Sequence, residues 1–312
     1  MTEVERPGLT EDEYVCYRRR FCNWGRWGTD DELGTLNHIT PAVRRKAAAL
    51  VQEGRSVSLA RPLDTTKGTA NPYPAHHFVA MPGSGGMLDY IGMFIHGLTL
   101  THIDALCHLP TSDGRLWNDR PITESGMPAT HNGTIDFLQG GIVTRGVLYD
   151  VPRFRGTEFV APGRPVLASE LRDVAGAQGI EPAPGDAVVI RSGYAPFWRA
   201  QEHEPPFAQV AGVHATCVEY LFEQNAAVLV WDFQDAPTED QGIPNPVPMS
   251  PVAMHVHHMV LPYMGMPIVD NAELEQLAAV CEELGRWEFQ MIVAPLHVPG
   301  ATGSPVNPIA VF

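Results

Sequence analysis

The sequence predicts an α/β fold, and three observations lead to this prediction. Short apolar runs that suit strands alternate with amphipathic segments that suit helices, which is typical of a sheet with flanking helices. Glycine (29 residues) and proline (28 residues) are abundant, which indicates many turns and long ordered loops. No repeat, low-complexity tract or linker-like break divides the chain, so we expect a single domain over 1–312 with residues 1–40 as an N-terminal arm.

The first part of the chain is expected to hold few regular elements. Residues 1–40 are rich in aromatic and acidic side chains and are expected to form an ordered loop or arm. Thr40 precedes a proline and is a suitable N-cap, so a helix is expected over 41–52, before a glycine that can end it. Alternating apolar residues predict a strand over 55–60, and residues 65–86 are expected to be a loop.

The later segments carry clearer periodicity. Apolar runs beside turn residues predict strands, whereas apolar residues that recur every three or four positions predict helices. Leu274, Leu277 and Cys281, for example, fall on one face of a helix. On these grounds strands are expected over 141–150, 186–191, 226–231 and 288–294, and helices over 169–179, 213–225 and 271–285.

The composition excludes several classes of function. Apolar residues make up 44% of the chain and charged residues 18%, so a sizeable core can form. The formal net charge of −15, without a basic patch to offset it, argues against binding to nucleic acid or to an anionic membrane. The N-terminus has no apolar export segment, no window approaches the ~20 apolar residues of a membrane span, and the five scattered cysteines contain no CxxC pair. We therefore expect a cytoplasmic protein with reduced thiols.

The segment from His96 to His108 is the most informative stretch. It holds three histidines and one aspartate among mostly apolar residues, and ionisable groups are costly to bury without a partner. Imidazole and carboxylate together are a normal ligand set for zinc or manganese. In an extended segment His102 and Asp104 share one face, and a helical turn after Asp104 would bring His108 back over it. The alternative is that these histidines are hydrogen-bonded core residues.

A second cluster of histidines lies about 150 residues later, in the run 251–258. It contains His255, His257 and His258, and Asp270 follows. The fold can bring ligands from such distant segments to one metal site, although these histidines can also simply face one side of a strand or a helix. No motif of comparable strength competes, since the chain has no GxGxxG after a strand, no Walker A loop and no GxSxG elbow.

Taken together, the two clusters resemble the cyclase family of metal-dependent hydrolases, which includes bacterial kynurenine formamidase and isatin hydrolase. The family signature His-x-Gly-Thr-His-x-Asp-x-Pro-x-His is matched in its second half by residues 101–108, and further matches lie at 268–271, 294–296 and 303–308. Residues 27–37 look like a longer branch of the family. The resemblance implies a swivelling β/β/α fold with a mixed β-sheet core and flanking helices, a zinc or manganese site, and assembly into a homo-oligomer, either a dimer or a tetramer.

The resemblance also implies roles for individual residues. His102 and Asp104 match two metal ligands that belong to the catalytic site, and the aspartate is able to bridge two ions. His108 matches the histidine assigned as general acid or base. Either His257 or His258, together with the aspartate at position 270, resembles the ligand pair of a second metal.

Three positions depart from the family pattern. The first signature histidine falls on Leu98, and its nearest substitute as a ligand is His96, two residues earlier. Position 100, which often carries histidine in the longer branch, is Leu100, and the signature proline is Leu106. A site with two metals, with one metal or with none is therefore open.

We expect a metal-dependent hydrolase that cleaves an amide, lactam or ester of a small organic molecule. A divalent zinc or manganese ion would lower the pKa of bound water toward ~7 and polarise the carbonyl, and His108 would move the proton. The alternative function is that of a metal-independent cyclase, isomerase or lyase of secondary metabolism on the same scaffold, and Leu98 and Leu100 favour it.

Overall fold

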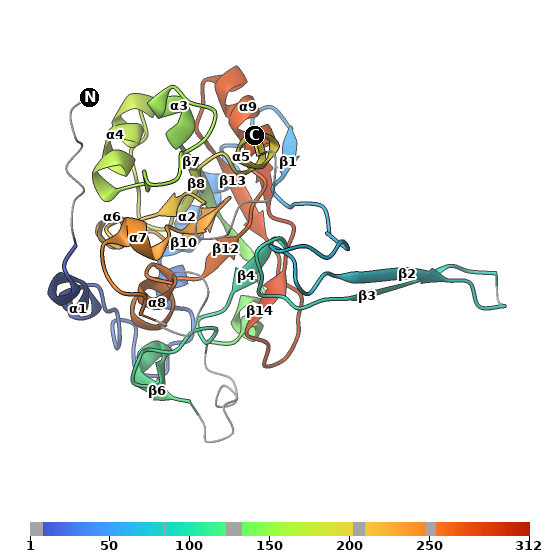
Figure 1. The fold of residues 1–312 in the computed structure, drawn as a ribbon, viewed down its shortest axis with the longest axis horizontal. Helices are drawn as coiled ribbons and strands as arrows, with labels where there is room; N and C mark the ends of the chain where they lie inside the picture. Colours follow the sequence, from blue (N-terminus) through green and yellow to red (C-terminus); the bar gives the residue numbers. More distant parts are fainter. Residues whose placement is uncertain (1–8, 84, 123–132, 202–209, 247–253) are drawn as a thin grey trace.

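The computed structural model describes residues 9–83, 85–122, 133–201, 210–246 and 254–312, and within these ranges a nine-stranded mixed sheet forms the centre (Figure 1). The strand order is β1 (Ser56–Ser58), β15 (Ile309–Val311), β13 (Glu288–Val293), β7 (Ile142–Asp150), β8 (Ala187–Arg191), β10 (Val228–Trp231), β12 (Ile268–Asp270), β4 (His102–Asp104) and β14 (Gly303–Pro305). The first eight residues of the expected arm, residue 84 of the expected loop and residues 251–253 of the second histidine-containing run lie outside the described residues.

The middle of the sheet is parallel and its two sides are antiparallel. β7, β8, β10 and β12 pair in parallel, whereas β13, β15 and β1 on one side and β4 and β14 on the other pair antiparallel. The parallel strands are buried on both faces, which explains why 187–190 and 228–231 are continuous apolar runs. The expected α/β class with a mixed sheet is therefore confirmed.

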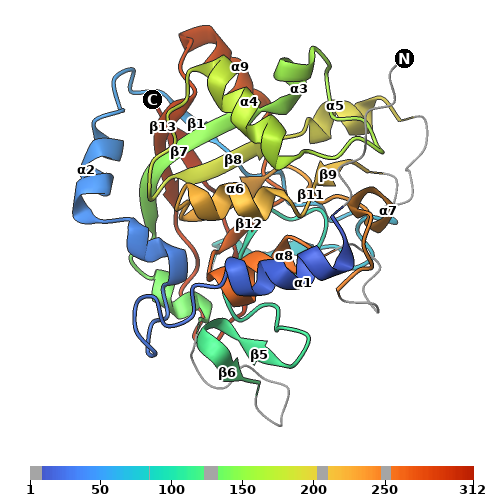
Figure 2. The same ribbon diagram turned by 90° about the vertical axis from the view of Figure 1, so that its left-hand side faces the viewer.

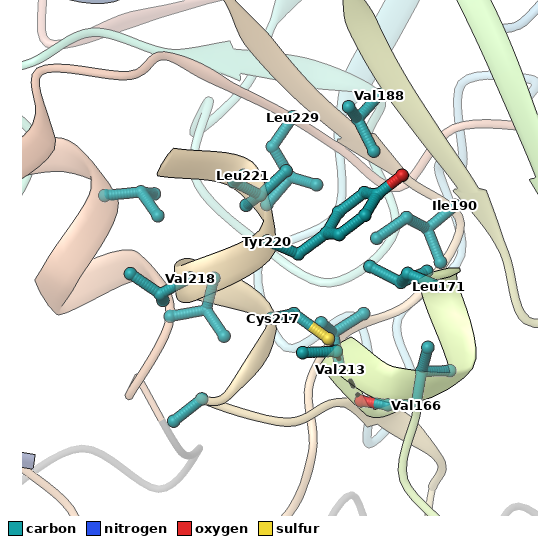
Figure 3. Close-up of a cluster of buried hydrophobic side chains, with 14 of the residues drawn as sticks. Val166, Leu171, Val188, Ile190, Val213, Cys217, Val218, Tyr220, Leu221 and Leu229 are labelled. Carbon is teal, nitrogen blue, oxygen red and sulfur yellow. Dashed lines mark hydrogen bonds between the residues drawn. The ribbon is translucent and has the colours of Figure 1, made fainter. Parts of the chain in front are cut away.

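Helices cover both faces of the sheet. Figure 2 shows α4 (Ala168–Gln178), α6 (Cys217–Glu223) and α1 (Glu11–Arg20) on one face. In the core beneath them, Leu171 and Tyr220 pack against Val188 and Ile190 of β8 (Figure 3). The other face is covered by α9 (Glu275–Leu284), with α2 (Pro41–Ala48) packed beside it, over a second apolar cluster that includes Val189.

Most sequence-predicted elements of the second half are confirmed. The four expected strands are β7, β8, β10 and β13, and the helix expected over 169–179 is α4, closed by Gly179 in the left-handed conformation. The helix expected over 213–225 begins only at Cys217, because β9 (Gly212–Val213) pairs with β11 (Gln234–Asp235). Likewise α9 begins four residues later than expected, because Asn271 has a positive φ of 55° and Ala272 forms an isolated bridge to Ala60.

In the first half, the predicted helix and strand form but are shorter than expected. Thr40 caps α2, since its side chain accepts the N–H of Val43 at 3.3 Å. The helix ends at Ala48, where the Leu50 N–H bonds to the Ala47 carbonyl three residues back and so closes a tight turn. The strand expected over 55–60 is β1, reduced to three residues.

Two predictions for the first half are incomplete. The arm contains a helix, α1, whose start is fixed by a capping box between Thr10 and Glu13. The loop expected over 65–86 contains β2 (His76–Ala80), which pairs with β3 (Leu88–Gly92) in a hairpin that projects from the body of the molecule (Figure 1). Both strands of this hairpin are almost entirely exposed, so its sequence lacks the alternating pattern that marks a half-buried strand.

The remaining elements are short connections. They are α3 (Val151–Arg155), α5 (Tyr194–Arg199), α7 (Thr238–Gln241), α8 (His257–Met259), the strands β5 (Arg115–Leu116) and β6 (Arg120–Pro121), three 3₁₀ turns (Gly34–His38, Trp117–Asp119 and Ile135–Leu138) and a π-helical turn (Val260–Met264). Among the described residues, no helix combines the length and the apolar character needed to cross a bilayer.

Candidate metal centre

Two adjacent strands and one short helix bring the predicted site residues together. β4 carries His102 and Asp104, and its neighbour β12 carries Asp270, which pairs with His102 in the antiparallel register. The first residue of α8 is His257. These four residues are at most 2% exposed, so they form a polar cluster buried beside an apolar core.

The spacing of two residues on β4 places both ligand candidates on the same face of the sheet. Ile103, between them, points to the opposite face and joins the core. On the other side of β4, Gly303 of β14 leaves room for the ring of His96, since a Cβ at Gly303 would lie 2.7 Å from its Cε1. The fold therefore supplies the space in which His96 approaches the cluster.

Asp104 lies at the middle of the cluster. Its Oδ1 is 2.8 Å from Nδ1 of His96 and 3.3 Å from Nε2 of His102. Its Oδ2 is 3.6 Å from Nε2 of His257 and 4.0 Å from Nε2 of His108. This Oδ2 is buried and has no hydrogen-bond partner among the described residues, which is unusual for a carboxylate oxygen inside a protein.

Asp270 faces the same two histidines from the neighbouring strand. Its Oδ2 is 3.1 Å from Nε2 of His257 and 3.8 Å from Nε2 of His102. Its Oδ1 accepts a hydrogen bond from the indole N–H of Trp231, and Gln234 donates to its Oδ2 at 3.4 Å. The two imidazole Nε2 atoms thus both point into the space between two carboxylates.

Hydrogen bonds behind the histidines hold them in this orientation. Nδ1 of His102 donates to the carbonyl of Leu100 at 2.8 Å, and Nδ1 of His257 donates to the carboxylate of Asp235. In the neutral form each ring therefore has its lone pair on Nε2, facing the cluster, and this backing is typical of metal-ligating histidines. Asp235 also accepts the N–H of Val256, which fixes the start of α8.

Sequence reasoning missed Asp235. It is separated from His257 by more than twenty residues and belongs to no motif. The signal that points to it is positional: it lies just beyond the carboxyl end of the parallel strand β10, and sites in α/β sheets collect at such ends.

The charges of the cluster are strongly coupled. Burial alone would raise the pKa of Asp104, but the neighbouring imidazoles, His108 first, hold it well below its usual range. Burial alone would lower the pKa of His257, but Asp270 and Asp235 raise it well above its usual range. The carboxylates thus require positive charge nearby, which protonated imidazoles supply here and a cation can supply equally.

The donor atoms fit a divalent metal ion. They form two groups, one of His96, His102 and Asp104 and one of Asp104, His257 and Asp270, and within each group the ligand atoms lie within 4.8 Å of one another. Asp104 belongs to both groups, and its Oδ2, which forms no hydrogen bond within the described part of the chain, is available to a cation. Imidazole nitrogen with carboxylate oxygen is a suitable set for zinc or manganese.

His108 lies at the rim of the cluster. The helical turn expected after Asp104 is a tight turn instead, in which the His108 N–H donates to the carbonyl of Ala105 at 2.9 Å. Its ring stacks on His96 with 3.6 Å between centroids, and its side chain remains 18% exposed. Burial lowers the pKa of His108 to about 4, so the ring is neutral at pH 7.

His258 lies outside the cluster, so of the two adjacent histidines it is His257 that faces Asp104 and Asp270. Neighbouring residues on a helix point about 100° apart, so only one of them can face the two aspartates. The ring of His258 instead packs near Tyr263, with 6.3 Å between centroids. His255 is also outside the cluster, and its Nε2 bonds to the carbonyl of Pro244 at 2.9 Å.

A pocket of about 420 Å³ lies beside the cluster and is lined partly by His96. Leu98 and Leu100, the two departures from the family pattern, also line it, together with Tyr73 and Phe94. The departures therefore place apolar side chains on the wall of this pocket. A small organic molecule of modest polarity would fit such a lining.

Arg61 is a further residue that sequence reasoning missed. Its guanidinium lies 3.3 Å from the centre of the Tyr194 ring and donates to the carbonyls of Leu98 and Asp232. Its Nε has no hydrogen-bond partner among the described residues. Arg61 thus ties the pocket wall at Leu98 to the end of β10, and no local pattern in the sequence indicates this role.

Comparison with known proteins agrees with this architecture. The model of the Cyclase family, described as "Putative cyclase", matches residues 35–236. A crystal structure of a novel cyclase aligns with a TM-score of 0.78 and 31% identity, and the alignment covers 95% of this chain and 99% of the other. The fold and the family expected from the two histidine clusters are therefore confirmed.

More distant structures share the fold. Isatin hydrolase A from Labrenzia aggregata, bound to benzyl benzoate, has a TM-score of 0.55 at 17% identity over 85% of this chain and 94% of its own. A predicted metal-dependent hydrolase from Bacillus stearothermophilus has a TM-score of 0.50 at 15% identity over 82% and 97%. A search of the curated proteins gave no match.

Proposed function

The chain belongs to the Cyclase family, and we propose that it is a metal-dependent hydrolase that cleaves an amide, lactam or ester bond of a small organic molecule. The observation that carries this proposal is the buried Oδ2 of Asp104, which has no hydrogen-bond partner among the described residues and faces imidazole nitrogens and a second carboxylate. Burying such an atom is costly unless a cation binds it. The structural likeness to isatin hydrolase supports a hydrolytic reaction.

Two groups of residues would bind metal, and His108 would transfer the proton. His96, His102 and Asp104 would hold one ion, and Asp104, His257 and Asp270 a second. A bound zinc or manganese ion supplies Lewis acidity toward a carbonyl and acidity to a water molecule. Nε2 of His108, neutral at pH 7 and accessible at the rim, accepts the proton of the attacking water and returns it to the leaving nitrogen or oxygen.

A second candidate function is a metal-independent cyclase, isomerase or lyase. The observation that favours it is the apolar pocket wall, where Leu98 and Leu100 stand at positions that carry histidine in the family pattern. Under this alternative Asp104 and His108 would act as proton carriers without an ion. The two candidates differ in metal content, which is directly measurable.

The test is elemental analysis of protein purified without chelator and then supplied with zinc or manganese. We expect about one or more equivalents of metal per chain, and loss of that metal in Asp104→Asn, which removes the charge shared by both ligand groups. Asp119→Asn, at an exposed carboxylate that belongs to neither ligand group, is the matched control and should keep the metal. Metal content below about a tenth of an equivalent would favour the metal-independent alternative.

A reaction screen completes the test. Formamides, lactams and lactones of small aromatic and aliphatic acids should be hydrolysed by the metal-loaded protein. Dialysis against a chelator should abolish turnover, and either zinc or manganese should restore it. Turnover that is unaffected by metal removal would support the second candidate.

A further inference from the structure

The N-terminal arm contacts the segment that carries His257. This segment consists of α8 and the π-helical turn, spans 257–264 and ends at Gly265 in the left-handed conformation. The other two members of its ligand group, Asp104 and Asp270, lie on strands of the central sheet. A helical segment this short is only marginally stable by itself, so the position of His257 depends on what holds the segment.

The arm supplies hydrogen-bond donors to the end of this segment. The last carbonyl groups of a helix have no partner within the helix and must find one elsewhere. The donors that bind them here are Trp24 Nε1 to the carbonyl of Pro262 (2.7 Å), the Asn23 backbone N–H to Tyr263 (2.9 Å), Asn23 Nδ2 to Met264 (2.9 Å) and the Thr35 backbone N–H to Gly265 (2.8 Å). The ring of Trp24 also stacks on that of Tyr263, with 5.6 Å between centroids.

Two glycines let the arm and the segment approach closely. A Cβ at Gly34 would lie 1.9 Å from the carbonyl oxygen of Gly265, and Gly34 has a positive φ of 57°. Both the space and the backbone conformation therefore require glycine at this position. The contact between the arm and the segment is thus a feature of the two backbones as well as of the side chains.

At the start of the segment the arm acts through Tyr14 of α1. Its hydroxyl donates to the carbonyl of His255 at 2.9 Å, its ring meets the His255 ring edge-on at 5.6 Å, and it is 3% exposed. The N–H of the next residue, Val256, donates to Asp235. His257 follows directly, so Tyr14 and Asp235 together fix the backbone from which its ring reaches the cluster.

We propose that the N-terminal arm is a positioning element for one of the two metal groups. Through His257, Tyr14 and Trp24 set the affinity of the group formed by Asp104, His257 and Asp270. The group formed by His96, His102 and Asp104 contains no residue of the segment, so its affinity should not depend on the arm. The metal rests on the proposed function, whereas the support of the segment by the arm does not.

Zinc titration by calorimetry tests the proposal in two backgrounds. His96→Ala leaves the group that contains His257, and His257→Ala leaves the group that contains His96. In the His96→Ala background, Tyr14→Phe or Trp24→Phe should weaken zinc binding by about 2–10-fold, the worth of one hydrogen bond, because binding must then order what that bond held before. In the His257→Ala background, neither substitution should change the affinity.

Tyr17→Phe and Trp27→Phe are the matched controls. They make the same chemical changes within the arm, but Tyr17 packs on Phe21, and Trp27 on His38 and Trp117. Neither control should alter zinc binding in either background, and the melting temperature of the metal-free proteins shows that all variants remain folded. A residue that only stabilises the fold cannot favour one group over the other. Equal weakening in both backgrounds, or weakening in neither, would therefore overturn the proposal.

Hydrogen exchange tests the arm without any metal. In the metal-free double variant Tyr14→Phe/Trp24→Phe, backbone amides over 256–264 should exchange faster than in the metal-free wild type, whereas those of β4 should not change. Unchanged exchange over 256–264 would refute the role of the arm. A wild type that binds no zinc would instead refute the proposed function and the metal part of this proposal, and the exchange rates would still decide whether the arm holds the segment.

Discussion

In most proteins apolar side chains are buried and charged side chains are exposed. The buried centre around Asp104 and the exposed β2–β3 hairpin depart from this rule in opposite directions. The centre places carboxylates and imidazoles where water cannot reach them, and the hairpin places phenyl and aliphatic groups in water. Each arrangement is unfavourable by itself. The first arrangement supports the proposal of a bound cation, and the second leaves an apolar surface exposed on this chain.

The two regions differ in how their side chains are held. In the centre, hydrogen bonds to the Asp235 carboxylate and the Leu100 carbonyl orient the two histidine rings, so that each Nε2 faces the two carboxylates. On the hairpin, strand pairing and ring stacking fix the shape. Hydrogen bonds are directional and therefore fix the positions of the side chains, whereas apolar contacts are not directional.

The largest expected effect separates two histidines within the centre. His108→Ala should keep the metal and lower turnover by about 10²–10⁴, the usual worth of a general acid or base. His102→Ala should lose metal and turnover together, because its Nε2 faces both carboxylates. Turnover, metal content and melting temperature are measured on both variants. Near-normal turnover in His108→Ala would contradict a catalytic role and would mean that His108 only packs against His96.

The next effect tests the preorganisation of the centre. Asp235→Asn removes the carboxylate behind His257 without changing its size, and it should weaken metal affinity by about 10–100-fold. Competition with a fluorescent chelator measures the affinity. An unchanged affinity would show that the hydrogen bond to Asp235 only anchors α8. Gln234→Glu adds a negative charge beside Asp270, so it should have the opposite effect and bind the metal more tightly than the wild type.

Metal removal should separate the two regions in a single experiment. With metal at about a hundred times its dissociation constant, binding stabilises the folded state by about 2.7 kcal/mol, so a chelator should lower the melting temperature. The mass from light scattering should not change, because no ligand candidate lies on the hairpin strands. A change in mass on metal removal would show that metal binding and the association state of the protein are coupled.

The smallest effect is expected from the hairpin. Under conditions where both proteins are monomeric, Phe78→Glu/Tyr90→Glu should change the free energy of unfolding by no more than about 0.5 kcal/mol per substitution, because both side chains are exposed. Urea unfolding measures this value. Metal content should equal that of the wild type. A large loss of stability would mean that the ribbon supports the body of the protein.

Much of the fold follows from local patterns in the chain. β7, β8 and β10 lie where apolar runs predict strands, and the Thr40 cap begins α2 where its side chain predicts. The pairing of His102 with Asp104 on one face is also local, because side chains in a strand repeat every two residues. Such features depend on a few neighbouring residues and are readable from them.

Three other features were decided only by tertiary structure. The sequence leaves His257 and His258 equivalent, and the packing of α8 against β12 and Asp235 turns one of them inward. The hairpin carries no periodic pattern, because neither of its faces lies against the body of the chain. The pocket beside His96 joins the base of that hairpin to the cluster around Asp104. All three depend on contacts between segments far apart in the chain or on surfaces that remain uncovered. Neither kind of feature can be predicted from the spacing of neighbouring residues.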